Sequence, residues 1–541
     1  MTYKAIVEII ALIGLFFELR RQGLGRSGWW IVLMSALFGY EMVYKANFGM
    51  LACGVIAFFA VYAWRNWFVS LSASIILMAF LENRDAPHSF LGIQGMNPWN
   101  LLFFNVLCAW WTDRRRQGLS WDMPRQTVVL ALCALFVVFW SYSRVANDYE
   151  SLDVLNLPML EDLGGSRANL PHYTFMWVTS EYLINCVKWV LPGILLYDGC
   201  RTRRRVMLAL GVVLAEYFLI ATQVVNHMRL AAVTATATQL AHMAARDLDH
   251  TVGYFRTEIS MMLAGASWGI LSLLSLARTR RYQILLIVAA AWVALGQALT
   301  GGRAGYVTWG LTGLVLCVLR WRKMLPLIPL IILAVCLFLP AVRDRMMMGF
   351  GGGESSGGGG VNMAVVTSGR YEAWAHVIPA IKEAPILGYG RQAMVRTGIY
   401  EKIMADADDP GETFPHPHNA YLELLLDDGL VGFFLMMPIY FVALIQSFRL
   451  LMDRSDPLFS AVGGVAGALI LGLLFASMGS QSFYPKESSV AMWAAIGLML
   501  RVYVERARSG QTGQPLFGEV ESEEDAVELV EETAGGQVVS A

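Results

Sequence analysis

Long apolar stretches recur along nearly the whole of this 541-residue chain, and they constrain its fold more than any other feature. About fifteen of them approach the length of roughly 20 residues that a helix needs to cross a bilayer. A chain in lipid must satisfy its backbone hydrogen bonds internally, and these stretches lack the alternation of barrel strands. The sequence therefore predicts an all-α polytopic integral membrane protein, a bundle of roughly 12–15 transmembrane helices.

The composition agrees with this prediction, because 56% of the residues are hydrophobic and only 15% are charged. The net charge of −1 and the absence of a long basic block argue against a nucleic-acid partner. All 7 cysteines lie in or beside apolar stretches, which is typical of small core residues and not of disulfides or a zinc site. The first stretch lacks a basic start and a cleavage site, so we expect a retained span.

Short arginine-rich connections recur at every second junction between the predicted spans. They lie at residues 20–26, 114–116, 201–205, 278–281 and 320–323. Basic connections stay on the cytoplasmic side of a membrane, so we place these five inside, together with residues 449–454 and 501–508. This topology predicts that the N-terminus lies outside and the C-terminus inside.

Three long connections fall on the outer side of this topology, at about residues 144–175, 226–257 and 343–429. Only the last is long enough to have substructure of its own. The acidic end of the chain has the composition of a disordered segment. We therefore expect N-terminal transmembrane helices in residues 1–284, a central region 285–448 with the loop 343–429, C-terminal transmembrane helices 449–508 and an acidic cytoplasmic tail 509–541.

The long loop contains one predicted helix, over residues 369–383, which is stopped by Pro385 and followed by turns at Gly388 and Gly390. Arg370 stands at the start of this helix, where free N–H groups and the helix dipole favour an anion. The alternative is an ordinary solvated loop arginine.

A second arginine lies in the motif LTGGRAGY, residues 299–306, at the outer end of a predicted span. Its glycines would let the backbone come close to a ligand. Arg303 suits a phosphate, because the guanidinium donates hydrogen bonds in pairs and keeps its charge. The alternative is an arginine that reaches out to lipid head groups. Arg391 is a weaker candidate of the same kind.

Two histidines lie between prolines in TFPHPHNAYLELLLDDGLVG, residues 413–432. Prolines stiffen the backbone around His416, and Asn419 is a predicted N-cap for a helix that runs to Asp428 and ends at Gly429. His418 would then stand at a helix start, where a neutral imidazole can take a proton from a hydroxyl group. The alternative is a histidine at the membrane interface with no chemical role.

A metal site at this position is not expected. His416 and His418 follow an acidic run at residues 406–412, but Pro410 occupies a ligand position of the calcium-loop pattern. A pair of histidines could bind zinc, yet no third ligand is fixed by spacing. The acidic run reads instead as a solvated loop.

Ionisable residues within predicted spans keep transport open as a second class of function. Glu41, Lys188 and Glu216 are examples, and charges inside spans often mark a transport path. However, the sequence shows no pair of glycine- or proline-broken spans in matching halves, which is the pattern of an inverted-repeat transporter.

These motifs resemble the O-antigen ligase superfamily, which includes O-antigen ligases, O-antigen and exopolysaccharide polymerases and pilin oligosaccharyltransferases. His418, Asn419, nine residues, Gly429, two residues and Gly432 match the family's signature without a gap. LTGGRAG is similar to its Thr/Ser-x-x-Arg-Gly element, and SGRYEAW with APILGYG looks like its periplasmic-loop pattern. The chain departs from the pattern where Ala304 separates Arg303 from glycine. The resemblance covers about residues 285–445.

The resemblance implies a GT-C-like glycosyltransferase that moves a glycan from undecaprenyl diphosphate to an acceptor on the periplasmic face of the bacterial inner membrane. It implies inversion at the anomeric carbon, with no metal and no cofactor. By matching position, His418 would activate the acceptor hydroxyl, while Arg303 and Arg370 would hold the diphosphate. The candidate supporting residues are His416, Asn419, Arg391 and Tyr389.

The implied partners are the lipid bilayer, the lipid-linked donor, and polysaccharide export or chain-length regulator proteins. The acceptor stays open. It is a core glycolipid if the protein is a ligase, and a second lipid-linked repeat unit if it is an O-antigen or exopolysaccharide polymerase. A transporter or flippase of the same lipid-linked glycan is the alternative from another class.

Overall fold

The computed structural model describes residues 50–82, 97–156, 173–229, 231–327, 329–330, 333, 337–347, 370–406, 414–479, 482–512 and 516–517. Within these ranges every regular element is a helix, and seven helices are long and apolar enough to cross a membrane. The prediction of an all-α, multi-pass membrane protein is therefore confirmed. The first two predicted spans, most of the acidic run and most of the tail lie outside the described residues.

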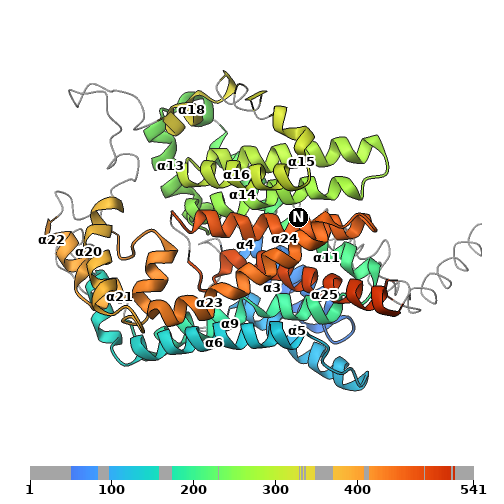
Figure 1. Cartoon of the computed structure of the whole chain (residues 1–541), viewed down its shortest axis with the longest axis horizontal. Coiled ribbons are helices and arrows are strands. Elements are labelled where there is room, and N and C mark those ends of the chain that lie inside the picture. The colour runs from blue at the N-terminus through green and yellow to red at the C-terminus, as the bar shows by residue number, and fades with distance from the viewer. Residues whose placement is uncertain are drawn as a thin grey trace, which may run out of the picture.

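The long helices run roughly side by side across the molecule (Figure 1). They are α6 (Arg125–Ala146), α11 (Arg203–Met228), α14 (Arg256–Ser272), α15 (Arg280–Leu299), α23 (Ala420–Met452), α24 (Pro457–Ala476) and α25 (Val490–Thr512). Shorter helices complete the bundle: α3 (Met50–Tyr62), α4 (Trp67–Leu81), α5 (Pro98–Arg116) and α16 (Arg303–Leu319). Short 3-10 segments are η1 (Tyr149–Asn156), η4 (Leu273–Ser275), η5 (Arg322–Leu327) and η7 (Glu487–Ser489).

Helix α24 lies at the centre of the bundle, and nearly all of its residues are buried. Small residues allow its neighbours to approach closely. A Cβ added at Gly463 would lie 2.5 Å from Ser447 O on α23, and one at Gly464 would lie 2.5 Å from Ser272 Cβ on α14. Glycines on this helix therefore set the spacing of the core.

The arginine-rich connections gather at one end of the bundle, where ion pairs join segments far apart in the sequence. Arg203 contacts Asp456 at 2.6 Å, and Arg506 contacts Asp453 at 2.6 Å. Arg501 reaches the α5–α6 connection. Helices α6, α11 and α24 begin at this end and α25 ends there, so their other termini lie at the opposite end of the bundle. The side of the membrane that each end faces stays a prediction.

The apolar stretch at residues 176–197, one of those predicted to cross the membrane, does not form one uninterrupted α-helix. The structure breaks it into α8 (Phe175–Thr179), a π-helical turn η3 (Ser180–Ile184), α9 (Asn185–Lys188) and α10 (Leu191–Gly199). Pro192 has no backbone N–H to continue the helix, so a new helix starts at Leu191. A local proline therefore overrides the continuous apolar pattern.

The long loop forms helical structure over the end of the bundle opposite to the arginine-rich connections (Figure 1). Its helices are α18 (Pro340–Met347), α20 (Arg370–Glu383), α21 (Ala393–Arg396) and α22 (Ile399–Asp406), and the neighbouring α12 (Ala231–Thr234) and α13 (Ala237–Thr251) pack on α18. Helix α20 matches the helix predicted over residues 369–383. It buries Val377 in a small apolar cluster with Met394 and Tyr400.

Helix α23 does not end at Gly429 as predicted, but bends there and continues to Met452. Gly429 has φ 61° and ψ −163°, a conformation that only glycine adopts readily. At the bend, backbone N–H and C=O groups lack the partners that a regular helix would give them. Residues 385–390, here called the docking turn, form hydrogen bonds with these groups. Leu430 N–H donates to Pro385 O at 2.8 Å, and Tyr389 N–H donates to Leu426 O at 2.9 Å.

Candidate functional site

Residues 414–419, here called the histidine loop, lead into α23. The Asn419 side chain accepts hydrogen bonds from the N–H groups of Tyr421 and Leu422, at 3.0 and 3.3 Å. This confirms the predicted N-cap. Ala420 N–H donates to Ser477 O at 2.8 Å, which ties the start of α23 to the end of α24. The loop is thus fixed to the core of the bundle.

The two histidines lie against each other, with ring centroids 4.2 Å apart. Phe414 packs edge-on against His418, at a centroid distance of 4.1 Å. His418 itself has a positive φ of 48°, which is uncommon for a residue with a side chain. Trp374 Nε1–H of helix α20 donates to Pro417 O at 2.8 Å, which ties α20 to the loop. His418 is therefore held in one orientation by both α20 and the bundle.

Both histidines are half-buried, and their partial removal from solvent decides their protonation. Burial is the main cause that lowers the pKa of His416 to about 4, although nearby Glu423 opposes it. Burial also lowers the pKa of His418 to about 2, with further contributions from His416 and Arg370. At neutral pH both rings are therefore neutral, which is the form that can accept a proton.

The glycines around Arg303 allow the start of α16 to pack tightly on α14. A Cβ added at Gly305 would clash with the Ser260 hydroxyl and lie 2.8 Å from Ser260 Cβ. Gly301 adopts a positive φ of 65° just before the helix begins. The motif thus places Arg303 in the first turn of α16, beside the N-terminus of α14.

Four arginines from four different helices converge around residues 301–304. Arg345 Nε–H donates to Gly301 O at 3.3 Å. Arg256 Nη1–H donates to Ala241 O at 3.1 Å, and Ala241 Cα is 3.3 Å from the position of a Cβ at Gly301.

The fourth arginine approaches from the long loop, over the end of α24. A Cβ at Gly479 would lie 2.8 Å from Ala304 Cβ and 3.4 Å from Arg370 Nη1. We call Arg256, Arg303, Arg345 and Arg370 the arginine cluster.

Like charges held together make this cluster a strong attractor for anions. Burial is the main cause that lowers the pKa of Arg370, to about 10, and the charges of Arg303 and Arg256 add to it. Burial likewise lowers the pKa of Arg345. An anion bound in the cluster would raise the pKa values of Arg370 and Arg345 again, because it supplies opposite charge where solvent is partly excluded.

The structure brings the predicted residues Arg303, Arg370 and His418 to one end of the bundle, and it adds Arg256 and Arg345, which sequence reasoning missed. One signal could have found them. Both are basic residues on the side where the positive-inside rule predicts few, so their presence there called for an explanation other than topology.

Arg391, expected to support the site, lies in a buried carboxylate pocket. Its Nη1 is 3.5 Å from Glu423 Oε1 and 3.9 Å from Asp427 Oδ2, and its guanidinium lies 3.6 Å over the Tyr484 ring. Burial opposes its charge, but Glu423 and its neighbours raise the pKa of Arg391 overall. Tyr389 likewise hydrogen-bonds within the loop, through its hydroxyl to Ala380 O. Both are positioning residues that anchor the loop.

A lysine and a glutamate complete the charged surroundings of the histidine loop. Lys486 Nζ lies 3.6 Å from Glu258 Oε1, at the start of α14. The charge of Lys486 contributes to the lowered pKa of both His416 and His418. In the part of the chain that the structure describes, no three His, Cys, Asp or Glu side chains are placed to hold a metal ion.

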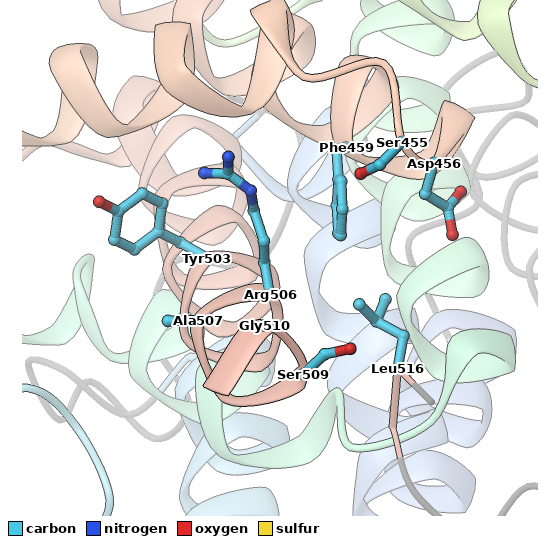
Figure 2. Close-up of a pocket in the computed structure, with 9 residues that line it drawn as sticks. All are labelled: Ser455, Asp456, Phe459, Tyr503, Arg506, Ala507, Ser509, Gly510 and Leu516. Carbon is cyan, nitrogen blue, oxygen red and sulfur yellow. The ribbon is translucent and has the colours of Figure 1, made fainter. Parts of the chain in front are cut away.

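A cavity of about 560 Å³ opens at the other, arginine-rich end of the bundle (Figure 2). It lies between the start of α24 and the end of α25, with Phe459, Tyr503 and Arg506 in its wall. Helix α24 has 20 residues, and at about 1.5 Å per residue it separates this cavity from the histidine loop by roughly 30 Å. The cavity is therefore distinct from the candidate site.

Comparison with known families agrees with this geometry. Residues 287–437 match the family model described as O-antigen ligase, and the matched segment contains Arg303, Arg370 and His418. A search of curated proteins finds no match. Over residues 287–437 the chain is therefore similar to the O-antigen ligase family.

Proposed function

We propose that the protein is a glycosyltransferase that moves a glycan from undecaprenyl diphosphate to a hydroxyl group of an acceptor. The observation that carries this proposal is the position of a half-buried, neutral histidine at the same end of the bundle as four converging arginines. A diphosphate leaving group needs cations, and an acceptor hydroxyl needs a base. The site supplies both.

In the proposed reaction, Arg303 and Arg370 hold the diphosphate of the donor. The His418 imidazole takes the proton of the acceptor hydroxyl, whose oxygen attacks the anomeric carbon of the donor sugar. The bond from that carbon to the diphosphate oxygen breaks, and the lipid diphosphate leaves with the electron pair. Attack from the face opposite to the leaving group inverts the anomeric configuration.

The magnitudes are sufficient for this chemistry. Each charge-assisted hydrogen bond to the leaving group contributes about 1.5–3 kcal/mol, and a positioned base contributes about 10²–10⁴ in rate. The arrangement also couples binding to basicity. The charge of Arg370 helps to lower the pKa of His418 in the free protein, so a bound diphosphate, by neutralising that charge, raises the basicity of the imidazole.

The arginine-rich end of the bundle faces the cytoplasm if the positive-inside rule holds. The histidine loop would then lie at the periplasmic face of the bacterial inner membrane, where lipid-linked glycans are presented for assembly. Polysaccharide export or chain-length regulator proteins are the corresponding proposed partners.

A purified protein in nanodiscs, supplied with an undecaprenyl-diphosphate glycan and an acceptor, tests the proposal. We expect His418→Ala to fold and to bind lipid diphosphate but to lose transfer by about 10²-fold or more. His250→Ala is the matched control, since His250 is an exposed residue of α13 and does not belong to the histidine loop. Full transfer by His418→Ala would exclude it as the base. Translocation of the lipid in liposomes without a new glycosidic bond would favour a flippase.

A further inference from the structure

We propose that His416 takes the proton on from His418 after each transfer, and that Glu423 is the positioning residue that favours this step. The three side chains then form a route by which the proton of the acceptor hydroxyl leaves the site. This inference rests on the proposed function, because it adds the step that returns the base of that site to its neutral form.

A proton does not stay on His418, because the charges around this imidazole are positive. The charged groups with the largest effect on its ring are all basic: His416, Arg370, Arg256 and Lys486. Each of them lowers the pKa of His418. A bound diphosphate offsets the charge of Arg370 while the donor is in place. Once the lipid diphosphate leaves, that charge acts on His418 again and drives the proton off the ring.

His416 lies where it can receive this proton. The two imidazole rings have centroids 4.2 Å apart and planes tilted by 54°. This separation allows proton transfer directly or through one water molecule. The pKa of His416 is about 4 and that of His418 is about 2, so the proton moves toward His416. His416 is half-buried and therefore also borders on solvent.

Glu423 favours His416 as the receiver of the proton. Its negative charge raises the pKa of His416, and it is not among the main groups that act on His418. The geometry of α23 agrees with this selectivity. Glu423 N–H donates to Asn419 O at 2.8 Å, so Glu423 lies one turn after the histidine loop. Side chains of a helix lean toward its N-terminus, which directs this carboxylate back over the loop.

Arg391 holds Glu423 in place through a loose ion pair. Its Nη1 is 3.5 Å from Glu423 Oε1, longer than the about 2.7–2.9 Å of a charge-assisted hydrogen bond. The carboxylate therefore keeps part of its charge for a second partner. Asp427, which lies 3.9 Å from the same Nη1, stands one turn further along α23. The other charged groups on which Glu423 acts are Asp428 and Lys486.

The proton is accounted for over a full cycle. The acceptor hydroxyl loses it to His418 as the hydroxyl oxygen bonds to the anomeric carbon. When the lipid diphosphate leaves, the proton passes to His416, whose positive charge is balanced by Glu423. His416 then releases the proton to solvent. Both imidazoles are again neutral when the next donor binds.

Rescue by an external base tests this route in the full-length protein in nanodiscs. The measurement is kcat for transfer from an undecaprenyl-diphosphate glycan, at low buffer concentration and after addition of imidazole. We expect His416→Gln and Glu423→Gln to lower kcat about tenfold at low buffer, because they slow the release of the proton. KM for the donor should not change. Added imidazole should restore the rate of both variants, whereas the unaltered protein should not respond to it.

Two further variants separate this role from a structural one. Glu423→Asp retains the carboxylate and should keep most of the activity. Asp427→Asn is the matched control, since it removes the other carboxylate beside Arg391 but not the one that acts on His416. Any loss of activity in Asp427→Asn should therefore not be restored by imidazole.

Two results would overturn the inference and leave the proposed function intact. In the first, His416→Gln and Glu423→Gln transfer at the full rate at low buffer concentration. In the second, both variants are slow and imidazole restores neither, as expected of residues that only support the fold. Absence of transfer by the unaltered protein under every condition would instead refute the proposed function.

Discussion

Replacing Gly429 with alanine should release the docking turn from helix α23. A Cβ at this position would clash with the carbonyl group of Ile386 and lie 2.7 Å from Leu387 N. The φ of 61° and ψ of −163° add strain of about 1–3 kcal/mol for any residue other than glycine. Alanine also favours a regular helix over glycine by about 1 kcal/mol. Together these effects disfavour the docked state by about 2–4 kcal/mol.

Hydrogen exchange measures directly how far Gly429→Ala destabilises the docked state. The N–H groups of Tyr389, Leu430 and Val431 bond across the docking turn, so their protection should fall by about 30- to 700-fold in Gly429→Ala. Transfer activity should fall with it, because the docking turn follows α20 and helps to position Arg370. Gly310→Ala is the control, since a Cβ at Gly310 meets no atom within 4 Å. Unchanged protection of the docking turn in Gly429→Ala would refute this account of the bend.

Three further predictions concern protonation and packing. Transfer should not decline as the pH falls from about 8 to 6, because the pKa values of His416 and His418, about 4 and about 2, lie well below this range. Stability should decline as the pH falls below about 6.5, because His416 and His418 take up protons in the unfolded chain but not in the folded one. Thermal melts of the double variant His416→Gln/His418→Gln should show a weaker decline with falling pH. A stability of the unaltered protein that rises toward pH 4 would contradict this prediction. Gly305→Ala should destabilise the protein by about 1–3 kcal/mol, because the added methyl group clashes with Ser260. In the same melting experiment, adding Ser260→Gly to this variant should restore part of the lost stability. An unchanged melting temperature in Gly305→Ala would show that α16 is free to move away from α14.

Features that depend on neighbours in the sequence could be predicted, and features that depend on distant segments could not. Asn419 caps α23 as expected, because an N-cap needs only the next few residues. The bend at Gly429 was misread as a helix end, since the docking turn that stabilises it comes from about forty residues earlier. Arg391 was read as an anion ligand, yet its carboxylate partners on α23 could not be inferred from the loop sequence.

The same reasoning explains why Arg256 and Arg345 were missed. They are separated by about ninety residues in the sequence and meet only because α13 and α18 pack on each other beside Gly301. In contrast, the residues next to Arg303 indicate where it lies, because the glycines on both sides of it permit the close packing of α16 on α14.

The bend in α23 also sets the order in which the protein can mature. Until the docking turn arrives, the backbone groups near Gly429 lack the partners that residues 385–390 provide, so the bend is costly and a straight helix is preferred. The docking turn belongs to the long loop, which the positive-inside rule predicts to cross the membrane before it can fold on the bundle. The segment that carries Arg370 and the helix that presents His418 therefore come together in one late step. Partly inserted chains would carry the separate parts of the site but not the assembled site.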